Sequence, residues 1–136
     1  MKKKLRIAVT RKLPEAVEAQ MLEIFDVKFN LKDMPFSQSQ LIKASNWADI
    51  LVPTVTDQVN AAVLNAAGSN LKLIANFGVG FNHIDLKAAK ARGIQVSNTP
   101  DVLTEDIADL AMALIIMASR RLGEGKRMVR AGDWTG

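Results

Sequence analysis

The stretch LKLIANFGVGFNHID, residues 71–85, decides the fold class of this chain. Its beginning, residues 71–75, is a short apolar run of the kind that makes a buried strand. Asp85 closes the stretch and is a suitable N-cap for a following helix. Gly78 and Gly80 lie in the loop between the strand and the helix. The stretch therefore predicts a strand, a glycine-containing loop and a helix in succession, which is the repeating unit of a parallel α/β fold.

The same alternation of strands and helices extends along most of the chain. Apolar runs rich in β-branched residues predict further strands at residues 5–10, 27–31, 50–52 and 94–97. Helices are predicted at residues 14–25, 37–45, 57–67 and 85–92, with Gly68 and Gly93 as stop signals. Five strands alternating with four helices predict a flavodoxin-like, doubly wound parallel sheet with helices on both faces.

Sheets of this type bind ligands in the loops at the carboxyl ends of their strands. Residues 76–82 form the most informative of these loops. Gly78 and Gly80 permit backbone conformations in which consecutive N–H groups converge on an anion. A small carboxylate could bind there without a cationic side chain. A tight strand-to-helix turn that binds nothing explains the same glycines equally well, so their spacing alone leaves both interpretations open.

Composition and charge exclude several classes of protein. With 136 residues, of which 49% are hydrophobic and 24% charged, the chain can enclose one core. Its net charge of +4 is spread along the sequence, so no nucleic-acid surface is expected. It contains no cysteine, which excludes disulfides and thiolate metal sites and favours a reducing compartment. The apolar run near the N-terminus is too short for a secretion signal, so we expect a cytoplasmic protein. We also expect no metal site.

Residues 102–136 do not fit the sheet-forming part, residues 1–101, and form a separate segment. The run IADLAMALIIMA, residues 107–118, is apolar on nearly every face, with Asp109 as its only charge, which predicts a helix buried all round. The run is shorter than the roughly 20 residues of a membrane span, so no membrane insertion is expected. We expect this helix to pack on a second domain or subunit, and residues 121–136 to end without a further strand or cap.

Two polar residues are further candidates for a functional role. His83, the only histidine, lies in the glycine loop, where no carboxylate stands out as its partner, so a solvated loop histidine is favoured over a general acid or base. Thr104 is predicted as the N-cap of the C-terminal helix, with ligand contact by its hydroxyl as the alternative. No G-x-G-x-x-G or P-loop motif occurs, so direct signs of a nucleotide-phosphate site are missing.

Several segments together resemble one enzyme family. They are NFGVGFNHID from Asn76, ARGIQVSNTPDVLTE from Ala91 with ADLA from Ala108, the pair Arg120-Arg121, and VRAGDW from Val129. These segments resemble the D-isomer-specific 2-hydroxyacid dehydrogenases, nearest the glyoxylate/hydroxypyruvate reductase branch. Members are more than twice this length, so the resemblance implies that only the N-terminal portion is present. It implies a flavodoxin-like substrate domain and a long helix that crosses into a Rossmann nucleotide-binding domain absent from this chain.

The resemblance also assigns roles to individual residues. The backbone amides of Val79 and Gly80 would bind the substrate carboxylate, and Phe77 and Gly78 would line the same pocket. Thr104 would lie near the nicotinamide of NAD or NADP, whose main binding domain is missing, and beside the glycine loop at the carboxyl edge of the sheet.

Two features of the resemblance limit these roles. The catalytic arginine, glutamate and histidine of the family would lie beyond residue 136, so no catalytic residue is assigned in this chain; His83 stands where the family usually has asparagine. Asn76 stands where phosphoglycerate dehydrogenases have arginine. A neutral amide cannot neutralise a phosphate, so a small unphosphorylated acid is favoured.

The leading hypothesis is the substrate-binding part of an NAD(P)-dependent 2-hydroxyacid dehydrogenase that reduces a small 2-keto acid, such as glyoxylate or hydroxypyruvate, by hydride transfer. The alternatives are a truncated, inactive fragment and a stand-alone flavodoxin-like binding module. The chain alone is expected to show no reductase activity. We expect a homodimer through the C-terminal helix and an arm at residues 123–134, because pairing would cover the apolar surface of that helix.

Overall fold

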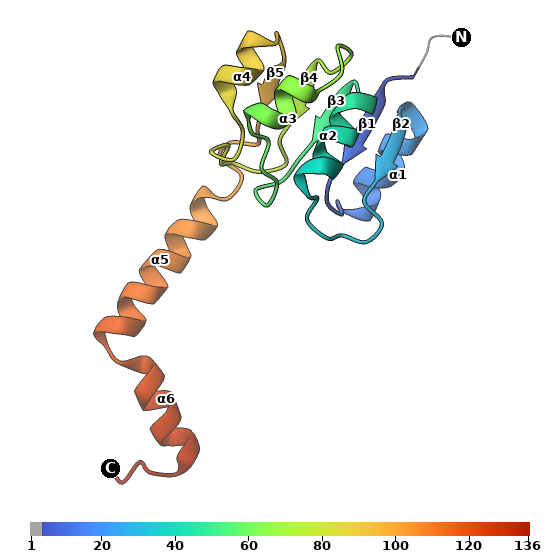
Figure 1. Cartoon of the computed structure of the whole chain (residues 1–136). Coiled ribbons are helices and arrows are strands. Elements are labelled where there is room, and N and C mark those ends of the chain that lie inside the picture. Colours follow the sequence, from blue (N-terminus) through green and yellow to red (C-terminus); the bar gives the residue numbers. More distant parts are fainter. Residues whose placement is uncertain (1–3) are drawn as a thin grey trace. The chain divides into compact units, whose positions relative to one another are not determined.

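The computed structural model describes residues 4–136. The chain divides into two compact units, Met1–Pro100 and Asp101–Gly136, and each is described by itself. Figure 1 shows that the first unit holds the strands and that the second consists of the helices α5 (Thr104–Ser119) and α6 (Leu122–Ala131).

A five-stranded, all-parallel sheet forms the centre of the first unit. Its order is β2-β1-β3-β4-β5, so the strand order reverses next to β1. In a doubly wound sheet this reversal is the point where the loops at the carboxyl ends diverge and leave a crevice. The predicted flavodoxin-like parallel α/β fold is confirmed. The strands are β1 (Arg6–Val9), β2 (Asp26–Phe29), β3 (Ile50–Val52), β4 (Leu73–Ala75) and β5 (Gln95–Ser97).

Helices cover both faces of the sheet. Successive residues of a strand point to opposite faces, and those of β1 join different apolar clusters, Ala8 the larger one and Ile7 and Val9 the smaller. The larger cluster takes residues from α2, α3 and α4, so these helices share one face. The smaller takes Met21 from α1, which covers the other face. The helices are α1 (Glu15–Ile24), α2 (Gln38–Trp47), α3 (Ala61–Ala66) and α4 (Leu86–Ala91).

Helix α3 begins later than the sequence predicts. The side chain of Asn60 caps it by accepting a hydrogen bond from Val63 N over 3.1 Å. The preceding segment is tied to the glycine loop instead, because Val59 N donates to His83 O. Asp57, the expected start of the helix, is fully buried in this segment. The residues that lead into α3 therefore serve to hold the loop that follows β4.

The two predicted stop glycines work in different ways. Gly93 follows α4 with φ +65°, the left-handed conformation expected after a helix. Gly68 does not have a positive φ, and a Cβ at this position would lie 2.8 Å from the backbone oxygen of Asn46. Gly68 is therefore required by the close approach of α2 and not by its own backbone conformation.

The second unit begins with α5, which spans Thr104–Ser119. The prediction that Thr104 is its N-cap is wrong. Leu103 has a non-helical backbone and its carbonyl accepts the first helical hydrogen bond, from Ile107 N over 3.0 Å, so Leu103 fills the cap position and Thr104 is the first helical residue. No residue of α5 is buried. Within the second unit, α6 does not supply the all-round burial that the sequence predicts for this helix.

Helix α6 (Leu122–Ala131) follows Arg121, whose φ of 52° interrupts the helical backbone after α5. The expectation that this segment ends without a cap is wrong, because Gly132 has φ 77° and its N–H donates to Val129 O. Gly132 is thus a left-handed C-terminal cap. No helix within residues 4–136 is long and apolar enough to cross a membrane.

Candidate functional site

The loop that follows β4 is anchored to both neighbouring strands at its start. Asn76 N donates to Ser97 O at the end of β5, over 2.8 Å. Phe77 N donates to Pro53 O, just after β3, over 2.9 Å. The loop therefore leaves the carboxyl edge of the sheet in a fixed direction, and its next residues are presented at the place where parallel sheets bind ligands.

The side chain of Asn76 lies inside the loop and is only 2% exposed. Its Nδ2 donates to Gly78 O over 3.0 Å and to Gly80 O over 2.9 Å. Its Oδ1 lies 2.9 Å from Nε2 of His83. One buried amide thus holds two carbonyl groups of the glycine loop and contacts the histidine at the end of that loop.

Two backbone N–H groups of the loop remain free. Within residues 4–136, no acceptor is hydrogen-bonded to the N–H of Val79 or of Gly80. The carbonyl of a trans peptide points away from the N–H in the same plane. Gly78 O is held by Asn76, and Val79 O accepts a hydrogen bond from Asn98 Nδ2 over 2.8 Å. Val79 N–H shares its peptide plane with Gly78 O, and Gly80 N–H shares its plane with Val79 O. Both N–H groups consequently point away from the side chains of Asn76 and Asn98 and are available to an anion.

The two glycines of the loop differ in the space around them, and neither is required for backbone freedom. Neither Gly78 nor Gly80 has a positive φ, so the predicted role of their conformational freedom is wrong. A Cβ at Gly78 would lie 3.3 Å from Val55 Cγ1, a tight contact, whereas a Cβ at Gly80 would meet nothing within 4 Å. The Cα of Gly80 therefore borders open space, where a ligand can approach the backbone closely.

A hollow of about 380 Å³ lies beside Gly80. Its walls combine an apolar group with neutral polar ones and include no lysine, arginine or carboxylate; they are Val55, Gln58, Gly80, Asn82 and His83. Phe77 lines a different hollow, of about 280 Å³, together with Val52 and Asn98. The structure thus places Gly80 and Phe77 on two neighbouring depressions at the same edge of the sheet.

His83 differs from its prediction as a solvated side chain. It is half-buried, and its ring nitrogen Nε2 contacts Asn76. Burial lowers the pKa of His83 below the ordinary value of 6.5, and the negative charge of Asp57 opposes this shift. The neutral imidazole is thus favoured inside the loop. Thr104 belongs to the second unit, and its placement near the loop and a nicotinamide stays a prediction.

Sequence reasoning missed Asp57 as part of this region. Its carboxylate oxygen Oδ2 accepts hydrogen bonds from Thr10 Oγ1 over 2.6 Å and from Thr54 N over 2.9 Å. Its other oxygen, Oδ1, is buried without a hydrogen-bond partner among residues 4–136. Asp57 thus holds in place the segment that contains Val55 and Gln58, two residues that line the hollow. No sequence signal separates this role from that of a helix-starting aspartate.

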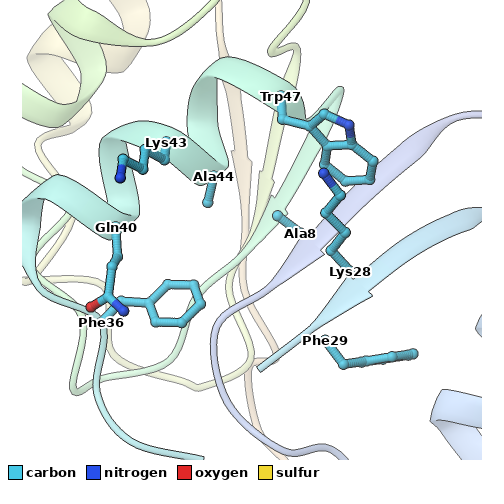
Figure 2. A pocket seen from close by; sticks show the side chains of 8 residues that line it. All are labelled: Ala8, Lys28, Phe29, Phe36, Gln40, Lys43, Ala44 and Trp47. Carbon is cyan, nitrogen blue, oxygen red and sulfur yellow. The ribbon is translucent and has the colours of Figure 1, made fainter. Parts of the chain in front are cut away.

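A separate pocket of about 310 Å³ lies between β2 and α2 (Figure 2). There the Lys28 side chain extends under the Trp47 ring, with Nζ 3.9 Å from the ring centroid. Phe36 and Ala44 supply further apolar wall. Lys28 and Lys43 line this pocket, so its walls are cationic, whereas those of the hollow beside Gly80 are neutral. Within residues 4–136, no cluster of three or more metal-binding side chains occurs.

Comparison with known proteins identifies the family. Residues 7–128 match the model of the D-isomer specific 2-hydroxyacid dehydrogenase catalytic domain. The chain belongs to this family. Membership in the D-isomer specific 2-hydroxyacid dehydrogenases confirms the resemblance seen in the sequence.

Individual relatives agree with this assignment. The chain is 41% identical over 131 residues to a glyoxylate reductase of Korarchaeum cryptofilum, covering 96% of this chain and 39% of the relative. It is 38% identical over 133 residues to a glycerate dehydrogenase of Hyphomicrobium methylovorum, covering 98% and 41%. A solved structure from Polaromonas sp. JS6 66, described as an NAD-binding D-isomer specific 2-hydroxyacid dehydrogenase, has a TM-score of 0.81 at 38% identity, covering 98% and 42%. The chain spans about two fifths of the length of these relatives.

Proposed function

We propose that this chain supplies the carboxylate-binding part of an enzyme that reduces a small 2-keto acid, such as glyoxylate or hydroxypyruvate, to the 2-hydroxy acid. The observation that carries the proposal is the pair of free N–H groups at Val79 and Gly80 beside a hollow of about 380 Å³. The names of the two relatives, glyoxylate reductase and glycerate dehydrogenase, support this substrate class.

The walls of the hollow favour a small acid without a phosphate. Two backbone donors match the two oxygens of one carboxylate, and such charge-assisted hydrogen bonds are stronger than neutral ones. The hollow has no lysine or arginine among its lining residues that could neutralise a second anionic group. Asn76, the polar residue at the base of the loop, is neutral and already engaged in three hydrogen bonds.

The hydride donor is proposed to be NADH or NADPH. The nicotinamide would supply a hydride to the carbonyl carbon, and the carbonyl oxygen would take up a proton. The residues of this chain would hold the carboxylate of the substrate. They would thereby fix the distance between the neighbouring carbonyl carbon and the nicotinamide, and the face of the carbonyl that receives the hydride. Thr104 would approach the nicotinamide; its side chain is exposed and has no hydrogen-bond partner within residues 4–136.

A homodimer is a second part of the proposal, with α5 and the arm at residues 123–134 at its interface. Large apolar side chains on α5 are exposed, including Ile107 and Leu110 at 60% and Ile115 at 61%. Many large apolar side chains exposed on one helix are typical of an interface.

The carboxylate site can be tested by ¹H–¹⁵N NMR on the 136-residue chain. Glycolate, the 2-hydroxy acid that the proposed reduction would form from glyoxylate, does not react without a nicotinamide. It is expected to shift the amide resonances of Val79 and Gly80, whereas the neutral analogue glycolamide is not. Gly80→Ala places a methyl group at the hollow and is expected to weaken glycolate binding without unfolding the chain. Gly125→Ala, whose Cβ would also meet nothing within 4 Å, is the matched control. Glycolate shifts that avoid residues 76–83 would contradict the proposed site.

A further inference from the structure

The orientation of the Asn76 side chain is set by its surroundings. Its NH₂ group faces the carbonyl oxygens of Gly78 and Gly80, at 3.0 and 2.9 Å. The reversed amide would bring its oxygen against these two acceptors, which repel it. The amide oxygen must therefore face His83, where Nε2 lies 2.9 Å away.

This orientation determines where His83 carries its proton. An amide oxygen only accepts hydrogen bonds, so Nε2 of His83 must be the donor. A neutral imidazole has one N–H group, which leaves Nδ1 without a proton. The backbone of His83 is also held, because its carbonyl accepts a hydrogen bond from Val59 N over 2.9 Å. The ring is therefore presented to Asn76 from a fixed position.

The contact between the two side chains is not easily replaced by water. Asn76 is only 2% exposed, so loss of the histidine N–H would leave a buried amide oxygen without a donor. An unsatisfied buried polar group is costly enough for the side chain to rotate or for the loop to shift. Either response would remove one of the two hydrogen bonds that hold the carbonyl of Gly78, which otherwise accepts only from Thr99 N over 3.1 Å. The peptide plane of that carbonyl directs the free N–H of Val79.

We propose that His83 is a positioning residue for the carboxylate site: its Nε2–H, donated to Asn76 Oδ1, locks the amide that aims the Val79 N–H at the substrate. This inference rests on the proposed function for its consequence in binding, but the hydrogen bond itself exists without a ligand. His83 holds the loop through Asn76 and does not exchange protons with the substrate.

The test compares two substitutions at position 83. His83→Gln retains an N–H donor at a similar reach and is expected to bind glycolate within about threefold of the original chain. His83→Leu has a similar apolar volume without a donor and is expected to bind roughly tenfold more weakly, the loss that corresponds to one hydrogen bond. Equal affinity of the leucine and glutamine variants would overturn the inference.

Ligand-free measurements keep this test separate from that of the proposed function. Long-range ¹H–¹⁵N NMR of the original chain is expected to show the Nε2–H tautomer of His83. The side-chain NH₂ resonances of Asn76 and the amide of Val79 are expected to shift in His83→Leu and to be retained in His83→Gln. An Nδ1–H tautomer, or unchanged Asn76 and Val79 resonances in a folded leucine variant, would overturn the inference. If glycolate fails to bind the original chain, the proposed function fails while these readouts still decide the role of His83.

Discussion

Thr10 and Asp57 are both fully buried, and the hydroxyl of Thr10 donates a hydrogen bond to Oδ2 of Asp57 over 2.6 Å. Thr10 follows β1, whereas Asp57 lies in the segment after β3, so the bond joins the ends of two adjacent strands. The same oxygen accepts a hydrogen bond from Thr54 N, which closes the segment into a tight turn. The hydrogen bond from Thr10, at the end of β1, therefore holds in place the segment whose Val55 lines the hollow.

Removal of either partner of this bond is expected to destabilise the chain. Thr10→Val deletes the donor with little change of shape, and Asp57→Ala deletes the acceptor. Each is expected to lower the free energy of unfolding by about 1–3 kcal/mol, because a buried polar group loses its partner. Urea denaturation of the double mutant is expected to show a coupling of about 0.5–3 kcal/mol. Strictly additive effects would show that the two residues act independently.

Arg92 is expected to stabilise the end of helix α3. Its Nη1 donates to Leu64 O and Asn65 O over 2.8 and 2.9 Å, and its Nη2 donates to Ala67 O over 2.8 Å. These are carbonyls that a helix leaves unsatisfied at its C-terminus. Arg92→Ala is expected to reduce the free energy of unfolding by about 2 kcal/mol, given the strength of hydrogen bonds from a charged donor. Arg130→Ala on the exposed α6 is the control, and an equal effect of both substitutions would exclude this capping role.

The arrangement of strands could be predicted because short apolar runs alternate with helical stretches along the chain. A central strand that is covered by helices on both faces of the sheet must be apolar throughout, which makes it visible in the sequence. The position of the glycine loop follows from the same pattern, since every parallel strand ends at one edge. The hydrogen bonds inside the loop do not follow. Asn76 contacts Gly78, Gly80 and His83 because of the path that the loop takes, and an asparagine after a strand is equally common in simple turns.

Long-range contacts explain the other differences between prediction and structure. Asp57 and Gly68 both have local roles that the sequence suggests, as a helix start and a helix stop. Their actual surroundings are Thr10 and the backbone of Asn46, residues distant in sequence. Burial of the C-terminal helix is a similar case, because the sequence shows that α5 is apolar but not which surface covers it.

Substitution by alanine is expected to destabilise the chain at Gly68 but not at Gly80. A Cβ at Gly68 would lie 2.8 Å from Asn46 O, which is backbone and cannot move aside without shifting α2. Gly68→Ala is expected to lower the free energy of unfolding by about 1–3 kcal/mol, as overpacking does. Gly80→Ala is expected to change it by less than about 0.5 kcal/mol, typical of a surface substitution. Thermal and urea unfolding of the two variants check this difference; equal stabilities would contradict it.

The stability of the chain is expected to decrease as the pH falls through the titration range of His83. Burial holds the pKa of folded His83 below 6.5, so the unfolded chain binds the proton first as the pH is lowered. Stability from this group is therefore fully present above pH 6.5 and is lost toward the lower, folded pKa. The free energy of unfolding, measured from pH 7.5 to 5.5, is expected to decline in the original chain and to stay flatter in His83→Gln. Parallel curves for the two proteins would rule out His83 as the cause.

Self-association through α5 is the last prediction, and it follows from the exposed apolar side chains of this helix. Leu114 is 55% exposed, and full burial of a leucine side chain stabilises an interface by about 1.5–3 kcal/mol. Leu114→Glu places a charge there without reducing helix propensity, so it is expected to weaken or abolish the dimer. Leu114→Met retains an apolar side chain of similar volume and is expected to preserve it. Sedimentation equilibrium at tens of micromolar should give the mass of two chains for the original protein and the methionine variant, and of one chain for the glutamate variant. A monodisperse monomer of the original chain would contradict the proposed pairing, because α5 would then remain soluble without a partner copy.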